Sequence, residues 1–394
     1  MVLAGFGVYV MTPEERGRLA LGIRDALARA LGALRDPAAS QQFHDVLRAR
    51  TAHTIATPVL IALNVLLFAF MLVGSGSLSD PQTLIAWGAS FGPLTTNGDW
   101  WRLFTAMFVH AGVLHLLVTI ASLVTVGFIL ERAVGPVALA AVYVAAGLIA
   151  NVVSLWSAPA LNVTLGSSGA VLGVYGLAVA SLTWTLYSRP EGAIPMPTVK
   201  RIAGAAAVFA LYNLMTDYLV ATSELAGFTT GVVAGLVVAR GITRERPPVQ
   251  RAGVVMALTL TIAIITVAPV RGILDVRAEV AQVIAVEQRT SGVYNGAVTK
   301  FRNGTLNAAD LAAVIDQSIM PELHEARVRL QALRGVPREH RRIIGDAERF
   351  LQLREESWRQ RSDALGGSDS DMLREADRAE QAALTALQSI KSAG

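Results

Sequence analysis

The sequence predicts an all-α polytopic membrane protein with a soluble helical tail, and three observations support this fold class. Hydrophobic residues make up 53% of the 394 residues and charged residues only 16%, whereas a globular domain carries about 25% charged residues. The charges are also uneven, because 12 lie in residues 1–55, 17 in 56–271 and 35 in 272–394. The charge-poor middle block contains seven apolar stretches, each near the ~20 residues that cross a bilayer.

The composition excludes several kinds of chemistry. The chain has no cysteine, which rules out disulfides, iron–sulfur clusters, thiolate zinc sites and cysteine nucleophiles. Its net charge is a modest +4. The arginines therefore favour a role as membrane-topology signals over a role in nucleic-acid binding. We expect no nucleic-acid partner, no cofactor and no metal site.

Residues 1–54 are predicted to form a cytoplasmic amphipathic segment. Thr12, Pro13 and Glu14 are typical of a helix start, with a hydroxyl N-cap, proline in the first position and acids in the first turn. The helix continues to about Leu34 with apolar residues at helical spacing, and it lies either on the protein surface or on the lipid interface.

The predicted spans divide the middle of the chain into a six-span core, 55–242, and a basic loop with a seventh span, 243–271. The spans lie near 55–73, 113–130, 136–155, 169–187, 202–219, 225–239 and 252–270. Lysine and arginine concentrate on one side of these spans, and the opposite loops carry only Arg102. Because basic loops stay in the cytoplasm, we expect a plasma (inner) membrane protein with a cytoplasmic N-terminus and an extracytoplasmic tail.

The tail, 272–394, is predicted to be an extracytoplasmic helical domain. Breaks at Gly304, at 335–337 (GVP) and at 366–368 (GGS) leave about four amphipathic helices, which would form a small bundle. His324 and His340 are isolated, and the tail shows no catalytic constellation. It is a candidate site for a protein partner.

Three polar or glycine-rich features stand out within the spans, where polar residues cost free energy. The first is GSSG at 166–169, where the glycines permit a tight backbone and the helix start offers N–H groups to an anion or oxyanion. The same pattern also fits a simple serine N-cap.

The second feature is the pair His110 and His115 at the outer entry to the second span. Five residues apart on a helix they would point in different directions, which argues against a shared metal. The third is the stripe Gly227, Gly231 and Gly235 on the sixth span, which gives this span one flat face. We expect that face to pack on the Gly169 patch of the fourth span, placing Phe228 near Ser168.

Taken together, the motifs resemble the rhomboid family of intramembrane serine proteases over about residues 55–242. The matching pieces, in order, are WGA at 87–89, GDWWRL at 98–103, FVHAGVLHL at 108–116, Gly127 with Glu131-Arg132, GSSGA at 166–170 and GVVAG at 231–235. Each piece is weak alone, but the ordered set is specific.

The resemblance implies a six-helix core with its active site open to the outer face. Ser168 would attack a peptide bond in a substrate's transmembrane segment, with a base histidine on the sixth span. The backbone at the serine, with Ser167 and His115, and a nearby asparagine would form the oxyanion hole. Arg102, Glu131, Gly166, Gly169, Gly231 and Gly235 would be structural, and the fifth span would act as a gate.

The sequence departs from the family pattern at two positions. The base histidine is replaced by Phe228, and no histidine occurs between His115 and His324. The oxyanion asparagine is replaced by Thr119. A serine hydroxyl is a weak nucleophile without an adjacent base, so the resemblance implies a rhomboid-like pseudoprotease that binds transmembrane helices of client proteins in the bilayer without cutting them.

Two alternatives stay open at this stage. In the first, the chain is an active intramembrane serine endopeptidase with a non-standard base. Glu224, one turn before Phe228, could supply that base if it folded inward, with Asp217 and Tyr218 nearby. In the second, the chain is a transporter or sensor, which predicts more charge within the spans and an internal repeat. The sequence shows neither of these features.

Overall fold

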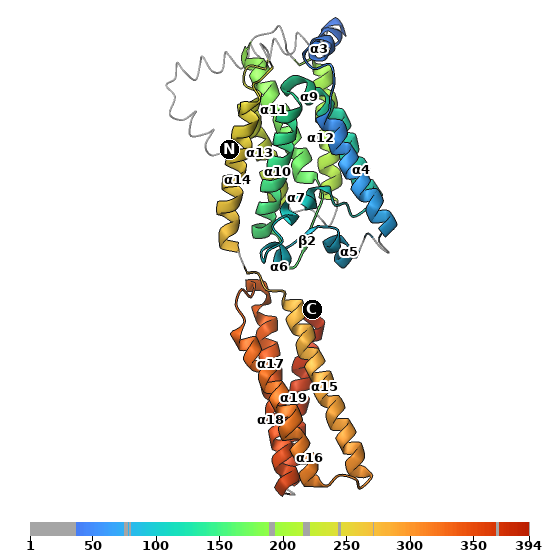
Figure 1. Ribbon diagram of the computed structural model, residues 1–394, viewed down its shortest axis with the longest axis vertical. Coiled ribbons are helices and arrows are strands. Elements are labelled where there is room, and N and C mark those ends of the chain that lie inside the picture. Colours follow the sequence, from blue (N-terminus) through green and yellow to red (C-terminus); the bar gives the residue numbers. More distant parts are fainter. Residues whose placement is uncertain are drawn as a thin grey trace. The chain divides into compact units, whose positions relative to one another are not determined.

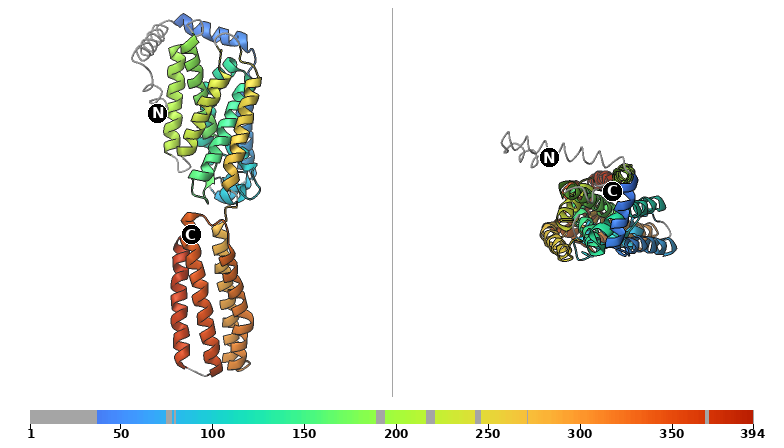
Figure 2. Two further views of the ribbon diagram at one scale, coloured as in Figure 1. Left: turned by 90° about the vertical axis from the view of Figure 1, so that its left-hand side faces the viewer. Right: turned by 90° about the horizontal axis from the view of Figure 1, so that it is seen from above.

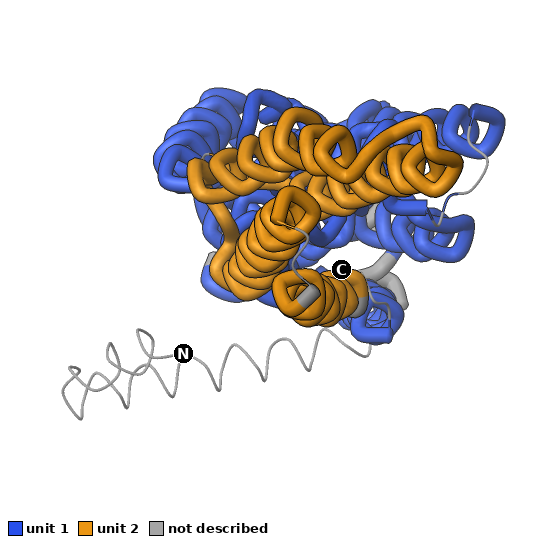
Figure 3. Tube along the Cα trace, turned by 90° about the horizontal axis from the view of Figure 1, so that it is seen from below, with its two compact units in different colours: residues 1–270 blue, residues 271–394 orange. Residues whose placement is uncertain are grey.

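The computed structural model describes residues 37–393 apart from 75–77, 79, 189–193, 216–220, 243–245, 271 and 368–369. The predicted amphipathic helix before residue 37, together with Asp217 and Tyr218, therefore lies outside the described residues. The chain divides into two compact units, Met1–Val270 and Arg271–Gly394 (Figure 3).

The first unit is built almost entirely of helices (Figure 1). Its helices are α3 Pro37–Arg50, α4 Ala56–Gly74, α5 Pro81–Ala86, α6 Gly92–Thr95, α7 Arg102–Thr105, α8 Val113–Ser122, α9 Phe128–Val134, α10 Pro136–Ser157, α11 Ser168–Ser188, α12 Met196–Leu214, α13 Ala221–Val238 and α14 Gln250–Val267. A π-helical turn, Leu123–Gly127, joins α8 to α9. Two short antiparallel strands, β1 Ser90–Phe91 and β2 Val163–Thr164, pair Ser90 with Thr164.

Six helical segments within the described residues are long and apolar enough to cross a membrane. They are α4, the continuous segment Val113–Val134, α10, α11, α13 and Gln250–Val270. The all-α polytopic fold class is thus confirmed. The predicted fifth span, 202–219, differs: its helix α12 begins earlier, includes Lys200 and Arg201, and ends at Leu214, so it is not among the six.

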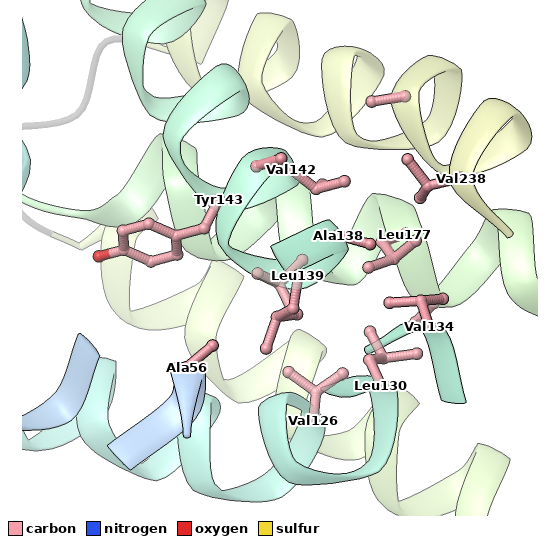
Figure 4. Packing of buried hydrophobic residues seen from close by; sticks show 14 of the residues in the cluster. Ala56, Val126, Leu130, Val134, Ala138, Leu139, Val142, Tyr143, Leu177 and Val238 are labelled. Carbon is pink, nitrogen blue, oxygen red and sulfur yellow. The ribbon is translucent and has the colours of Figure 1, made fainter. Parts of the chain in front are cut away.

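The core of this unit forms around α10, which supplies twelve buried residues. Leu139, Val142 and Tyr143 are fully buried and belong to one apolar cluster with Leu130 of the second span and Leu177 of α11 (Figure 4). By contrast, only three residues of α12 are buried. Few side chains are therefore buried in the helix that the family resemblance assigns to a gate.

Glycines bring α11 and α13 into backbone contact, as the glycine stripe predicted. A Cβ built on Gly231 would lie 2.0 Å from the carbonyl oxygen of Gly173, and one built on Gly227 would lie 2.4 Å from that of Gly169. A Cβ on Gly235 would lie 2.7 Å from the Cβ of Ala180. Helices approach this closely only where side chains are absent, so the prediction that these two faces pack together is confirmed.

Two buried charged side chains fix the connections between spans. Arg102 donates from Nε to Asp99 at 2.9 Å and from its guanidinium to the carbonyl oxygens of Ile85 and Ala89. These bonds tie the loop after the first span to α5 and β1. Such contacts fit the structural role expected for Arg102.

Glu131, a residue of α9, is fully buried against the first turn of α4. Its carboxylate accepts the backbone N–H groups of Ile55, Ala56 at 2.7 Å and Thr57 at 2.8 Å. The first N–H groups of a helix have no partner within the helix and carry its positive dipole end. Glu131 therefore satisfies the first turn of the first span, which fits the structural role expected for it.

The second unit consists of long helices that run alongside one another (Figures 1 and 2). They are α15 Val276–Arg302, α16 Ala308–Val314, α17 Met320–Ala332, α18 Arg341–Gly367 and α19 Ser370–Ala393. A π-helical turn, Ile315–Ile319, makes α16 and α17 nearly continuous. The breaks that the sequence predicted at Gly304, 335–337 and 366–368 fall at the ends of α15, α17 and α18.

The bundle buries an ionic network as well as apolar residues. The guanidinium of Arg354 donates from Nε to Glu287 at 2.9 Å, from Nη1 to Glu380 at 2.9 Å and from Nη2 to Ser291 at 3.2 Å. It also lies over the ring of Trp358. The side chains of Arg354 and Glu287 are 3% and 9% exposed. Three long helices, α15, α18 and α19, meet at this arginine.

Candidate functional site

The GSSG segment connects β2 to α11 in a conformation that needs glycine. Gly166 has φ +96°, and its N–H donates to the carbonyl oxygen of Ala106 at 2.8 Å. A Cβ on Gly166 would lie 2.7 Å from Cε1 of His115. The left-handed backbone and the contact with the His115 ring both exclude other residues at this position.

Ser167 points into the interior of the core. Its Oγ lies 3.4 Å from Nε2 of His110 and 3.3 Å from Oγ1 of Thr119. All three side chains are fully buried. Ser167 and Thr119, which the family resemblance assigned to the oxyanion hole, thus form one polar cluster with His110.

The two histidines approach each other, contrary to the prediction that they point apart. Their ring centroids are 4.8 Å apart and meet edge to face. The prediction was wrong because it placed both residues on one helix, whereas α8 begins only at Val113 and His110 lies in the preceding turn. Among the described residues no group of three metal-ligating side chains occurs.

His110 is held as a neutral ring with a defined tautomer. Burial, and secondarily the neighbouring His115, lowers the pKa of His110 to about 3. Its Nδ1 lies 3.0 Å from the carbonyl oxygen of Phe108, which can only accept a hydrogen bond, so Nδ1 carries the proton. Nε2 is then an acceptor that faces Ser167 and not Ser168.

Ser168, the first residue of α11, has a different partner. Its half-buried hydroxyl hydrogen-bonds the carboxyl group of Glu224, in the first turn of α13. Both side chains line a small pocket between α10, α11 and α13. Its other polar lining residues are Asn151, Ser154, Thr164 and Ser223.

Phe228 packs against apolar residues of the core. It is half-buried and contacts the main apolar cluster of the core, as Leu172 does. On α13, the side chain that bonds to Ser168 is that of Glu224 and not that of Phe228. The close approach of Phe228 to Ser168 stays a prediction, as do the catalytic and oxyanion roles of Ser168, His115, Thr119 and Ser167.

Some pocket residues were not singled out from the sequence as site residues. Asn151 donates to the carbonyl oxygen of Leu103 at 2.8 Å, and Ser154 lies 3.3 Å from the hydroxyl of Thr164. The side chain of Asn151 therefore joins α10 to α7. The signal for the pocket was the run of small polar residues near the end of α10, because polar residues in spans mark functional regions.

Comparison with known proteins identifies the first unit. Residues 97–241 match the family model described as the rhomboid domain. The chain is 30% identical to rhomboid protease GluP of Bacillus subtilis over 186 residues, which is 47% of this chain and 34% of that protein. It is 28% identical to rhomboid protease AarA of Providencia stuartii over 191 residues, 45% of this chain and 65% of that protein.

The relatives include a protein described as inactive. Inactive RHOMBOID-like protein 8 of Arabidopsis thaliana is 28% identical over 109 residues, 27% of this chain and 31% of that protein. The chain spans between about a third and two thirds of the length of these relatives. The match, the ordered motifs and the six apolar helices agree: this is a multi-pass membrane protein with a rhomboid domain over residues 97–241.

Proposed function

We propose that this protein is a rhomboid-fold pseudoprotease that binds transmembrane segments of client proteins. The proposal rests on Phe228, which the family resemblance places at the position of the base histidine and which packs on the apolar core. A phenyl ring cannot accept the serine proton. Loss of a triad member lowers turnover by roughly 10⁴–10⁶ in soluble serine proteases.

The surroundings of Ser168 support the same proposal. The two histidines near the GSSG segment contact Gly166 and Ser167, and no other histidine occurs between His115 and His324. Because only three residues of α12 are buried, a client helix could reach the core from the side of this helix. In this proposal the N-terminus is cytoplasmic in a plasma (inner) membrane, and the C-terminal bundle recruits a protein partner on the outer side.

A second candidate function rests on the bond between Ser168 and Glu224. A nucleophile and a base within hydrogen-bond reach are the signature of an activated serine, and a carboxylate can accept a proton as a general base. In this alternative, Glu224 replaces the missing histidine. The protein would then be an intramembrane serine endopeptidase that cleaves transmembrane substrates.

Labelling with a fluorescent fluorophosphonate separates the two functions, because the probe reacts only with an activated serine. The full chain in detergent is compared with Ser168→Ala, Glu224→Gln and, as a neighbouring control, Ser167→Ala. The pseudoprotease predicts no labelling of the wild type. Labelling that is lost in both Ser168→Ala and Glu224→Gln but kept in Ser167→Ala would establish the Ser168–Glu224 pair and overturn the proposal.

Two rescue variants test whether the scaffold lacks only its base. Phe228→His, alone and with Thr119→Asn, restores the family pattern. Glu224→His places a histidine on the turn that contacts Ser168. Labelling gained in either variant, and lost again on adding Ser168→Ala, would show an intact nucleophile site without a base.

A further inference from the structure

Four arginines gather in the connection between α17 and α18. They are Arg334, Arg338, Arg341 and Arg342, and all four are exposed. One acid, Glu339, lies among them. Within the described residues none of the four arginines has a carboxylate within 4.0 Å. Several arginines elsewhere on the bundle's helices, among them Arg289, Arg327, Arg354 and Arg361, are ion-paired within that part of the chain, although Arg302, Arg349 and Arg378 are not.

This basic loop, 334–342, is held against the first residues of the bundle. The N–H of Leu274 donates to the carbonyl oxygen of Gly335 at 3.2 Å. A Cβ on Gly335 would lie 1.9 Å from the carbonyl oxygen of Gly272, and both glycines have positive φ. The two backbones can touch in this way only because both residues are glycine.

The position of Gly272 in the chain places the basic loop at the membrane boundary. The last span ends at Val270, so Gly272 follows it by two residues. Two residues of extended chain reach at most ~7 Å. For any orientation of the bundle, the part of the loop that contacts Gly272 therefore stays near the end of that span, within about the thickness of the lipid headgroup region.

The charge at this end of the bundle is positive. Besides the four loop arginines it includes the exposed Arg277, and the acids are Glu339 and Asp275. The carboxylate of Asp275 is already engaged, because it accepts the N–H of Arg277 as the N-cap of α15. Residues 272–277 and 334–342, all of which the structure describes, therefore contain five arginines and two acids.

We propose that the basic loop is a docking surface for anionic phospholipid headgroups in the leaflet where the last span ends. Guanidinium groups bind phosphate with paired hydrogen bonds. Basic residues within a Debye length of an anionic membrane are attracted to it. Each arginine contributes roughly a fivefold factor to the docking equilibrium, and the bound loop would tether this end of the bundle to the bilayer.

The absence of native cysteine allows a direct test with the full chain. Ala332→Cys places a fluorophore on the exposed last residue of α17, next to the basic loop. The protein is inserted at one copy per nanodisc, made of phosphatidylcholine alone or mixed with phosphatidylglycerol, with a quencher attached to a fraction of the headgroups. Asn303→Cys is the matched control, because the 27 residues of α15 put it ~40 Å from Val276.

We expect the Ala332 label to be quenched more strongly in the anionic nanodiscs than in the neutral ones. The difference should vanish in 1 M salt, where the Debye length falls to about 3 Å. It should also vanish in the variant Arg334→Gln, Arg338→Gln, Arg341→Gln, Arg342→Gln, with the helix content unchanged by circular dichroism. The Asn303 label should respond to neither lipid nor salt.

Either of two results would overturn the proposal. One is equal quenching of the Ala332 label in neutral and anionic nanodiscs. The other is a lipid-dependent difference that the fourfold variant retains. The test does not depend on whether the core binds or cleaves client helices.

Discussion

The rhomboid core and the C-terminal bundle are both helical, but different forces hold their helices together. In the core, α11 and α13 meet through bare backbone at Gly173 and Gly231. In the bundle, amphipathic helices meet through apolar side chains and through ion pairs such as Arg354 with Glu287. Lipid is as apolar as a helix surface, so close backbone packing replaces the hydrophobic effect in the core.

The two regions also differ in how they hold a buried charge. Glu131 in the core is stabilised by the N–H groups that begin α4, and no Lys or Arg of the described part of the chain forms an ion pair with it. Arg354 in the bundle is stabilised by two carboxylates from other helices. The core therefore stabilises a buried charge with the backbone N–H groups of one helix end, whereas the bundle stabilises one with charged side chains that are distant in sequence.

The largest effect is expected from filling the helix contact of the core. Gly231→Leu places a side chain where even a Cβ would lie 2.0 Å from the carbonyl oxygen of Gly173. Because that neighbour is backbone, we expect a loss of about 5 kcal/mol, in the range seen only for severe mutations. Thermal unfolding in detergent, followed by light scattering, measures the change.

The matched control for this prediction is Gly253→Leu. Gly253 is also a glycine within a span, but nothing lies within 4 Å of a Cβ there. We expect this variant to unfold at nearly the wild-type temperature. Equal destabilisation of the two variants would contradict the account of the α11–α13 contact.

A smaller but still large effect is expected from breaking the ionic network of the bundle. Arg354→Met leaves the carboxylate of Glu287 buried without its cation, which costs about 3–5 kcal/mol. Hydrogen exchange of α18 in the full chain measures the loss of protection. Adding Glu287→Leu should restore most of it, because an apolar pair can replace a buried ion pair. Failure of the second change to restore protection would show that the arginine acts through other contacts.

The sequence predicts those parts of the fold that depend on local pattern. Apolar runs near 20 residues located six helices that can cross the membrane, and glycine spacing on the sixth span predicted the contact of Gly231 with Gly173. The fifth span is less clear, because Lys200 and Arg201 lie within its helix. Arg354 joins residues 67 and 26 positions away, and no local pattern encodes such a pairing.

The candidate site was predicted less completely for a related reason. The ordered motifs brought Ser168, His115 and Gly166 into one region. The partners of the two serines depend on turns, however: His110 reaches Ser167 because α8 begins at Val113, not at His110. Glu224 was considered only as a residue that could fold inward, and the bond to Ser168 follows from how α13 packs on α11.

The smallest of these effects is expected at the buried charge of the core. Glu131→Gln keeps the shape of the side chain but turns an N–H donor toward the N–H groups of residues 55–57 and removes the charge at the start of α4. Hydrogen bonds to a charged acceptor and the helix dipole each contribute, so we expect a loss of about 2 kcal/mol in thermal unfolding.

Glu356→Gln on the exposed face of α18, where Glu356 pairs with Arg359, should change stability by less than about 0.5 kcal/mol. If the two substitutions cost the same, the backbone of α4 is not what stabilises Glu131, and the contrast between the core and the bundle fails at this residue.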